Sequence, residues 1–281
     1  MEYKLSSLSS QIVQPDTLLQ TPNPNRLFID VRLGSTPEDE LKSFRECHIH
    51  GAVYAQIRDV FASPPTAESG NLPLPEIDFL QQQLRQWQVD AETELVLYGP
   101  SMALAARGWW VLRWAGLSNV KVLDGGLKAW VNHGGAVAQG DFVPSARPSP
   151  APLALRPGNM PSISVTEVES LPRDTLLIDA RDEASYLAGC IPRACNLAAS
   201  EQWTPASNLR TVREIRQLYD SVGVTAKSDV VIYCGGGVLS ALEVLTLAAL
   251  GVQSRLFVGS WSEWNRSPER MALSASERRV A

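Results

Sequence analysis

Cys234 is the residue of this sequence whose type and surroundings are best suited to chemistry. It follows the apolar run Val230–Tyr233 and precedes three glycines, and a helical pattern then extends from Ala241 to Leu250. This order predicts a buried strand, a tight loop and a helix. Backbone N–H groups in such a loop favour an anion at its centre, so we expect the cysteine to react as a thiolate.

Six residues after the cysteine form the expected active-site loop. Glycine lets the backbone curl where a Cβ would clash, and the loop amides would stabilise a negatively charged sulfur. We expect the hydroxyl of Ser240 near the start of the helix, at the usual capping position. The loop residues are Gly235, Gly236, Gly237, Val238, Leu239 and Ser240.

The elements that must position this loop occur twice in the chain. Two apolar strands end in Asp-x-Arg, at Leu27–Arg32 and at Leu176–Arg181. The run Leu95–Gly99 likewise matches Val230–Cys234, and in both copies a helical segment, a further strand, a Gly-rich turn and a tryptophan follow. A repeat of this length indicates duplicated domains and not a solenoid.

A proline-rich connector separates the two copies. Six prolines lie between residues 144 and 161, and such a stretch cannot join a sheet or a helix. We therefore expect an N-terminal domain over residues 1–140, a linker over 141–161 and a C-terminal domain over 162–281. Because Gly99 occupies the position that matches Cys234, we expect only the C-terminal domain to be catalytic.

Strand patterns alternate with helical patterns in both halves of the chain. Two of the helical patterns are Phe79–Trp87 and Thr211–Tyr219. This alternation predicts an α/β protein with two domains, each a mostly parallel sheet with helices on both faces. Ligands of such sheets bind at the carboxyl ends of the strands, where Cys234 is placed.

The composition argues against several classes of partner. A net charge of −5 over 281 residues does not favour nucleic acid as a partner. No apolar run approaches the roughly 20 residues of a membrane span, and the first residues lack the pattern of a secretory signal. The four cysteines do not form a disulfide framework, so we expect a cytoplasmic protein. The oligomeric state stays open.

Taken together, these motifs resemble those of the tandem-domain rhodanese superfamily, which includes thiosulfate and 3-mercaptopyruvate sulfurtransferases. The resemblance covers nearly the whole chain, and it is strong because the motifs are duplicated and in order. Besides the two Asp-x-Arg strands and the Cys234 loop, its carriers are the segments 48–52 (His-Ile-His-Gly-Ala), 106–110 (Ala-Arg-Gly-Trp-Trp), 124–130 (Asp-Gly-Gly-Leu-Lys-Ala-Trp) and 259–264 (Gly-Ser-Trp-Ser-Glu-Trp).

The resemblance implies a sulfurtransferase with a catalytic C-terminal domain and an inactive N-terminal one. Cys234 would take a sulfane sulfur from a small donor, thiosulfate or 3-mercaptopyruvate, and hold it as a persulfide. A thiol or cyanide acceptor would then remove it, with no metal or organic cofactor required. Asp179 and Arg181 would brace the loop from the neighbouring strand.

The sequence departs from the family pattern where a donor would bind. Thiosulfate sulfurtransferases usually carry a basic residue directly after the cysteine, where this chain has Gly235. The neutral loop is nearer the mercaptopyruvate type, but its hydroxyls are rearranged. The usual substrate arginine is replaced by Ser185. A carboxylate or sulfonate donor needs a cationic clamp, for which Arg58, Arg193 and Arg210 are candidates.

Two positions of the first domain also depart from the family. The acidic position after the turn at residues 48–52 aligns with Gln56, and the family's cleft histidine falls near Gly70 or Asn71. These departures leave room for an alternative, a non-catalytic or redox-regulatory rhodanese-like module that binds a partner.

Other classes fit the sequence less well. A phosphatase of the dual-specificity type needs an arginine six residues after the cysteine, where this chain has Ser240, and an arsenate reductase favours a cationic loop. Cys47, His48 and His50 offer only three metal ligands, and we expect a structural turn there. Cys190 and Cys195 are interpreted as ordinary thiols.

Overall fold

The computed structural model describes residues 11–34, 36–141, 153–205 and 207–277, and it contains two five-stranded sheets whose strands are all parallel. When the strands of each sheet are numbered in sequence order, the two sheets have the same spatial order of strands. The first is β1 (Ile12–Val13), β6 (Val120–Leu123), β5 (Glu94–Tyr98), β2 (Arg26–Arg32) and β4 (Val53–Gln56), and the second is β8 (Ser162–Ile163), β12 (Arg255–Phe257), β11 (Val230–Tyr233), β9 (Leu176–Asp179) and β10 (Cys195–Asn196). A small antiparallel pair, β3 (His48–Ile49) and β7 (Val137–Ala138), lies beside the first sheet.

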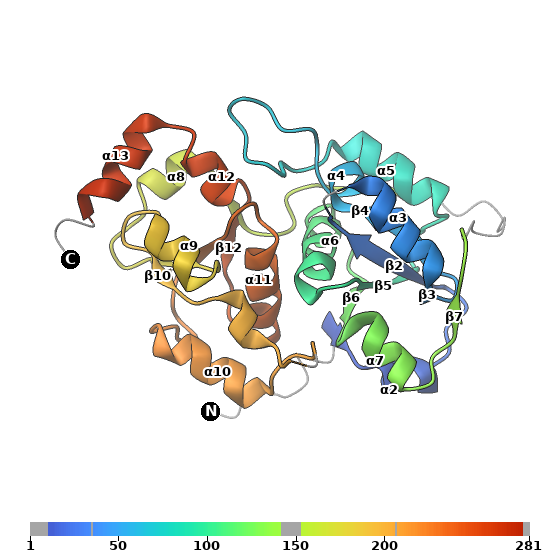
Figure 1. The fold of residues 1–281 in the computed structure, drawn as a ribbon. Coiled ribbons are helices and arrows are strands. Elements are labelled where there is room, and N and C mark those ends of the chain that lie inside the picture. The colour runs from blue at the N-terminus through green and yellow to red at the C-terminus, as the bar shows by residue number, and fades with distance from the viewer. Residues whose placement is uncertain (1–10, 35, 142–152, 206, 278–281) are drawn as a thin grey trace.

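Helices cover both faces of each sheet (Figure 1). Around the first sheet these are α2 (Pro15–Gln20), α3 (Pro37–Glu46), α4 (Ile57–Val60), α5 (Ile77–Gln86), α6 (Met102–Trp114) and α7 (Gly126–Asn132). Around the second they are α8 (Val165–Glu169), α9 (Glu183–Ala188), the 3-10 helix η1 (Ala199–Gln202), α10 (Val212–Ser221), α11 (Leu239–Ala249), α12 (Ser260–Trp264) and α13 (Pro268–Glu277). The central strands β5 and β11 are buried along their whole length, as expected for parallel strands covered on both faces. The predicted fold class is therefore confirmed.

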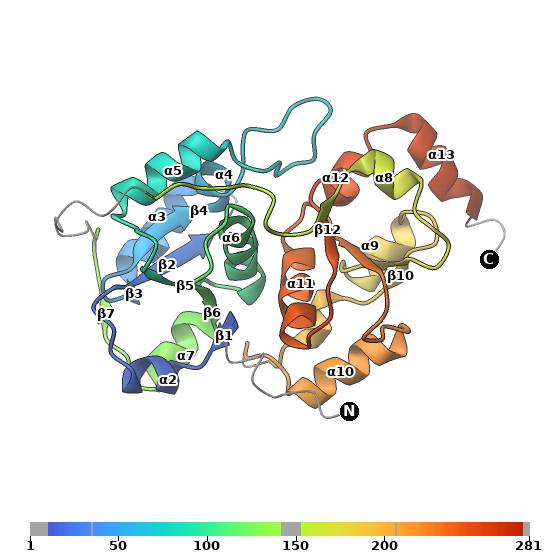
Figure 2. The ribbon, with the colours of Figure 1, turned by 180° about the vertical axis from the view of Figure 1, so that it is seen from behind.

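The two halves pack against each other through α6 and α11, which lie side by side between the sheets (Figures 1 and 2). Trp109 and Trp110 of α6 and Leu242 and Leu245 of α11 belong to one continuous apolar core that extends through both halves. Because this core removes large aromatic and aliphatic side chains from water, it holds the halves in a fixed relation.

Each half also sends a loop over the strand ends of the other. The loop of residues 62–76, between α4 and α5, reaches the second half, where Asn71 N donates to Ser262 Oγ at 2.9 Å. In return, Leu209 N, between η1 and α10, donates to Asp124 Oδ1 at 2.8 Å, just beyond β6. The carboxyl ends of both sheets are thus covered from the opposite half.

The predicted linker falls partly outside the described residues, which omit 142–152. Its later part follows the end of α6, where Arg156 N donates to Ala115 O at 2.8 Å and Asn159 N donates to Trp114 O at 3.1 Å. Over the described residues, no helix combines the length and the apolar character needed to cross a bilayer.

Candidate active site

Cys234 lies directly beyond β11, at the carboxyl end of the second sheet, and its side chain is almost fully enclosed. Only 1% of its surface is exposed. Its sulfur accepts two hydrogen bonds, from Gly237 N at 3.1 Å and from Ser240 Oγ at 3.3 Å. Two donors directed at one buried sulfur are the arrangement that a thiolate requires.

The placement of Ser240 differs from the prediction. Helix α11 begins at Leu239 and its N-cap is Val238, which makes no side-chain capping bond. Ser240 is therefore the second residue of the helix and not its cap, so the capping prediction was wrong. Ser240 lies in the first turn of α11, where a side chain can face the loop that precedes the helix. Its hydroxyl donates to the Cys234 sulfur and does not cap the helix.

The three loop glycines differ in how strictly the structure needs them. Gly237 has a φ of +82°, and a Cβ there would lie 2.7 Å from the carbonyl oxygen of Val258. A Cβ on Gly236 would make only ordinary contacts, and one on Gly235 would meet nothing within 4 Å. Gly235 is exposed. The third glycine is thus the one that the loop conformation demands.

The first turn of α12 holds the Cys234 loop in place. Cys234 N donates to Ser260 Oγ at 3.2 Å, and Cys234 O accepts from Trp261 N at 2.9 Å. Ser262 N donates to Gly235 O at 2.9 Å. Ser260 is buried and has a φ of +55°, a conformation that a non-glycine residue keeps only where its surroundings impose it. This turn fixes the backbone from which the sulfur extends.

Asp179 and Arg181 lie next to this turn. The Arg181 guanidinium donates to both Asp179 carboxylate oxygens, with Nε 2.9 Å from Oδ1 and Nη2 2.5 Å from Oδ2. It also lies 4.7 Å from the ring of Trp261, in cation–π geometry. The pair therefore contacts the residue whose amide binds Cys234 O, and this is a route by which it can brace the loop.

Two buried charged residues near the cysteine were not singled out from the sequence. Arg107 of α6 and Glu243 of α11 are both 0% exposed. Burial raises the pKa of Glu243 well above its usual range, and the nearby Cys234 anion raises it further. Burial lowers the pKa of Arg107 to about 10, while the Cys234 anion acts in the opposite direction. Each is an ionisable residue inside a largely apolar helix, and that pattern could have revealed both.

The arginines proposed as substitutes for the missing clamp lie elsewhere. Arg193 donates to Leu171 O and Pro172 O on the surface, and Arg210 donates to Glu201 O. Arg58 is exposed. The hydrogen bonds of Arg193 and Arg210 thus go to backbone carbonyls outside the Cys234 loop.

Two further aligned positions of this site can now be placed. Ser185 hydrogen-bonds Asp182 in the first turn of α9, through both its N–H and its hydroxyl. The side chain of Gln56 accepts from Arg58 N and caps α4. Both side chains thus stabilise the start of a helix, α9 for Ser185 and α4 for Gln56.

The remaining thiols and the histidines have local contacts. His48 bonds Phe44 O through Nδ1 at 2.9 Å and stacks on the Phe44 ring. Cys195 Sγ donates to Leu177 O, and burial raises the pKa of that thiol. Cys190 precedes it, before β10. In the part of the chain that the structure describes, no group of three or more His, Cys, Asp or Glu side chains could hold a metal ion.

The loop of residues 62–76 covers the cysteine from the first half. A Cβ on Gly70 would lie 2.5 Å from Gly259 O, so the two backbones are in close contact. Gly70 and Asn71, which align with the family's cleft histidine, thus lie at the site. This loop thus contributes to the enclosure of Cys234, of which 1% is exposed.

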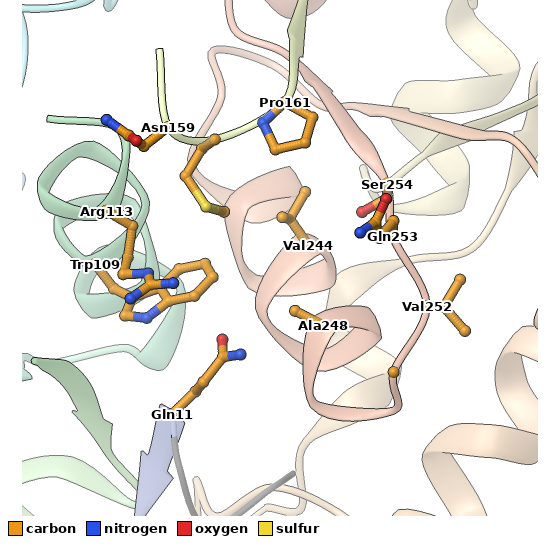
Figure 3. A pocket seen from close by; sticks show the side chains of 12 residues that line it. Gln11, Trp109, Arg113, Asn159, Pro161, Val244, Ala248, Val252, Gln253 and Ser254 are labelled. Atoms are coloured by element: carbon orange, nitrogen blue, oxygen red, sulfur yellow. The ribbon is translucent and has the colours of Figure 1, made fainter. Parts of the chain in front are cut away.

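A separate pocket of about 430 Å³ lies between the halves, beside the later turns of α11 (Figure 3). Trp109 and Arg113 of α6 face Val244 and Ala248 of α11 across it. None of the loop residues 235–240 lines this pocket. It is therefore not the space in which a donor would meet the sulfur.

Comparison with known proteins identifies related chains. The family model described as "Rhodanese-like domain" matches twice, over residues 14–133 and 164–267. A Mycobacterium tuberculosis protein, whose name gives thiosulfate sulfurtransferase as a provisional activity, is 30% identical over 264 residues, covering 90% of this chain and 92% of its own. A Pseudomonas aeruginosa protein, provisionally named as a 3-mercaptopyruvate sulfurtransferase, is 31% identical over 272 residues, covering 88% of this chain and 92% of its own.

Solved structures agree with these matches. The 3-mercaptopyruvate sulfotransferase SseA from Escherichia coli superimposes with a TM-score of 0.76 at 28% identity, covering 90% of this chain and 100% of its own. The 3-mercaptopyruvate sulfurtransferase from Leishmania major has a TM-score of 0.83 at 20% identity, covering 96% and 78%. At that identity the second likeness concerns the fold alone.

Proposed function

We propose that this chain, which belongs to the rhodanese-like domain family and is a sulfurtransferase, transfers sulfur through a persulfide on Cys234. The observation that supports this role most directly is the pair of hydrogen bonds donated to the Cys234 sulfur by Gly237 N and Ser240 Oγ. Both stabilise negative charge on that sulfur, which must be an anion to attack and an anion again when it leaves.

In the first step, the Cys234 thiolate attacks the sulfane sulfur of the donor. An S–S bond forms, and the bond between that sulfur and the rest of the donor breaks with its electron pair on the leaving group. With thiosulfate the leaving group is sulfite. With 3-mercaptopyruvate it is the enolate of pyruvate, which takes up one proton.

In the second step, a thiol or cyanide acceptor attacks the outer sulfur of the persulfide. The S–S bond breaks, and its electron pair returns to the Cys234 sulfur as the thiolate. The two donors that hold this thiolate before the first step also stabilise it as the leaving group of the second. The same contacts therefore serve both halves of the cycle.

Of the two donors, we propose 3-mercaptopyruvate as the better one. The residues from Gly235 to Ser240 carry no charge, and Gly235 is exposed where a basic side chain would meet a dianion. A monoanionic carboxylate needs less positive charge than thiosulfate does. The chain is also similar to proteins named for each donor, so the choice depends on the loop.

The first half is proposed to be non-catalytic, with the boundaries 1–140, 141–161 and 162–281. Gly99 occupies the position of the cysteine there, and the loop of residues 62–76 is its contribution to the site. Asp179 and Arg181 are proposed as supporting residues that act through Trp261.

Mass spectrometry of the intact protein tests the proposal. Wild type and Cys234→Ala are incubated separately with 3-mercaptopyruvate and with thiosulfate, and then with cyanide. We expect wild type alone to gain one sulfur atom, faster with 3-mercaptopyruvate, and to lose it to cyanide. A gain of equal size in Cys234→Ala would contradict the role of this cysteine. No gain with either donor would favour the regulatory module, in which a buried Cys234 without a substrate clamp binds no donor.

A further inference from the structure

Arg107 is a buried cation in the first half whose guanidinium reaches the second half. It extends from α6, and its Nη2 donates to two backbone carbonyls of its own half, Leu72 O at 2.9 Å and Phe61 O at 3.3 Å. Among the described residues, nothing accepts a hydrogen bond from its Nε or Nη1. Two carbonyl oxygens supply no negative charge, so these contacts do not neutralise the cation.

A buried guanidinium without a counter-ion is costly, because its charge is removed from water and no anion compensates for the lost hydration. Every other arginine of the described chain with comparable burial has one, as Arg32 has Asp30 and Arg181 has Asp179. Arg107 forms no ion pair with any described carboxylate. The acidic group that raises the pKa of Arg107, against the lowering by burial, is Cys234.

The position of Gly237 connects the cation to the sulfur. A Cβ on Gly237 would lie 3.0 Å from Arg107 Nη1, so the guanidinium touches the space that this glycine leaves empty. The N–H of the same glycine donates to the Cys234 sulfur at 3.1 Å. Arg107 therefore approaches the active-site loop at the residue whose amide binds the sulfur.

We propose that Arg107 is the counter-cation of the sulfur on Cys234, in the thiolate and in the persulfide, and that the first half supplies this charge in place of a basic residue on the loop. The inference rests on the proposed persulfide function. Arg107 is a positioning residue, because it sets the charge state of the sulfur and does not itself react. Two acidic groups oppose it near the sulfur, Glu243 of α11 and Asp179 of β9, and Arg181 pairs with the second.

This assignment gives the inactive half a part in the chemistry. The position directly after the cysteine, Gly235, is on the exposed side of the loop, whereas Arg107 lies on the buried side. There it is shielded from salt and water, so its effect on the sulfur is larger than that of an exposed charge. With the cation on the buried side, the exposed side of the Cys234 loop, which a donor would approach, stays neutral.

The pH profile of Cys234 alkylation by iodoacetamide tests the proposal without any sulfur donor. Wild type, Arg107→Gln, Arg107→Lys and the control Arg32→Gln are compared, and the modified cysteine is located by peptide mass spectrometry. We expect Arg107→Gln to shift the profile to higher pH by about one unit, which slows alkylation about tenfold at neutral pH. Arg107→Lys should restore most of the rate, and Arg32→Gln should leave the profile in place.

Coincident profiles of wild type and Arg107→Gln would overturn the proposal. An equal shift in Arg32→Gln would also overturn it, because the effect would then follow from general loosening. The alkylation profile depends on the Cys234 thiolate and on no sulfur donor. If the persulfide assay failed while Arg107→Gln still shifted the alkylation profile, the proposed function would be rejected and the role of Arg107 as counter-ion would stand.

A second measurement covers the case in which the Arg107 variants do not fold. The free energy of unfolding of wild type and Cys234→Ser is measured from about pH 6 to about pH 9. If a native thiolate faces Arg107, wild type gains stability over Cys234→Ser as the pH rises, because the folded protein releases that proton before the unfolded chain does. Parallel curves would show that no thiolate pairs with the cation.

Discussion

The strand–loop–helix units of the two halves share one frame and use their hydrogen-bond donors differently. In the first, β5 leads through Gly99 to α6, and the hydroxyl of Ser101 accepts a bond from Ala103 N and caps its own helix. In the second, β11 leads through Cys234 to α11, which has no side-chain cap. The donors at the start of the second unit are directed at a sulfur instead.

The first unit is also closed to a side chain. A Cβ on Gly99 would lie 2.2 Å from the carbonyl oxygen of Val31, at the end of the adjacent strand β2. Gly126 approaches from the other side, since its own Cβ would lie 2.8 Å from Gly99 O. The first half therefore differs from the second by more than a missing cysteine, because its backbone lies where a side chain of residue 99 would be.

The largest expected effect follows from substitutions at Cys234 and at Gly99, the matching position of the first half. Cys234→Ala should abolish persulfide formation, because no other thiol lies on the loop. Gly99→Cys should not create a second site, and its overlap with the strand should cost about 1 to 3 kcal/mol of stability. Persulfide mass and urea unfolding measure the two outcomes. A cyanide-removable sulfur on the thiol introduced by Gly99→Cys would show that the first unit can open.

A smaller but still large effect is expected within the catalytic loop. Gly237→Ala forces a Cβ toward Val258 O at a left-handed φ, so we expect about 2 kcal/mol of lost stability and about a hundredfold loss of sulfur transfer. Steady-state kinetics and urea unfolding check these values.

Gly235→Ala is the matched control, since a Cβ there meets nothing within 4 Å. Its stability should change by less than about 0.5 kcal/mol. Equal losses in Gly235→Ala and Gly237→Ala would mean that the backbone conformation at Gly237 is not what shapes the loop.

The two serines near the helix starts separate capping from catalysis. Ser240→Ala removes one hydrogen bond to the sulfur, so we expect sulfur transfer to fall about tenfold with little loss of stability. Ser101→Ala removes a helix cap in the other half, so we expect about 1 kcal/mol of lost stability and unchanged transfer. Both variants are assayed for turnover and for thermal unfolding. Slower transfer in Ser101→Ala together with unchanged transfer in Ser240→Ala would contradict the prediction.

The sequence predicted the fold and the position of Cys234 because both depend on local pattern. The duplicated strands, the alternation with helices and the glycines after the cysteine are all visible along the chain. The start of α11 was misplaced because Val238 and Leu239 are apolar and give no capping signal, although both are the boundary residues. The capping position expected of Ser240 was wrong for the same reason, whereas its expected place in the active-site loop agrees with the hydrogen bond from its hydroxyl to the Cys234 sulfur.

The charges around the site could not be placed from the sequence, because packing between the halves brings them together. Arg107 and Glu243 lie on different helices, and only the contact of α6 with α11 places both near one sulfur. Arg193 and Arg210 were equally plausible by residue type, and their backbone contacts on the surface exclude them. Arg107 and Glu243 differ from these two arginines in lying within largely apolar helices.

The last expected effect concerns Glu243, whose match in the first unit is Gly108, a residue without charge. Glu243→Gln keeps the shape of the side chain but cannot ionise. Because burial raises the pKa of Glu243 in the folded protein, the unfolded chain releases this proton first, so wild type loses stability as the pH rises from about 4.5. The variant lacks that loss, and we expect it to be more stable than wild type by about 1 to 3 kcal/mol at neutral pH.

Urea unfolding at a series of pH values measures this difference. Glu214→Gln is the control, because Glu214 is exposed, caps α10 and has a pKa below its usual range, so its stabilising contribution is present at neutral pH and is lost as the pH falls. The two variants should therefore diverge from wild type in opposite directions near neutral pH. If Glu243→Gln instead follows the wild-type curve at every pH, Glu243 is ionised in the folded protein and a cation must lie closer to it than the packing of α6 and α11 allows.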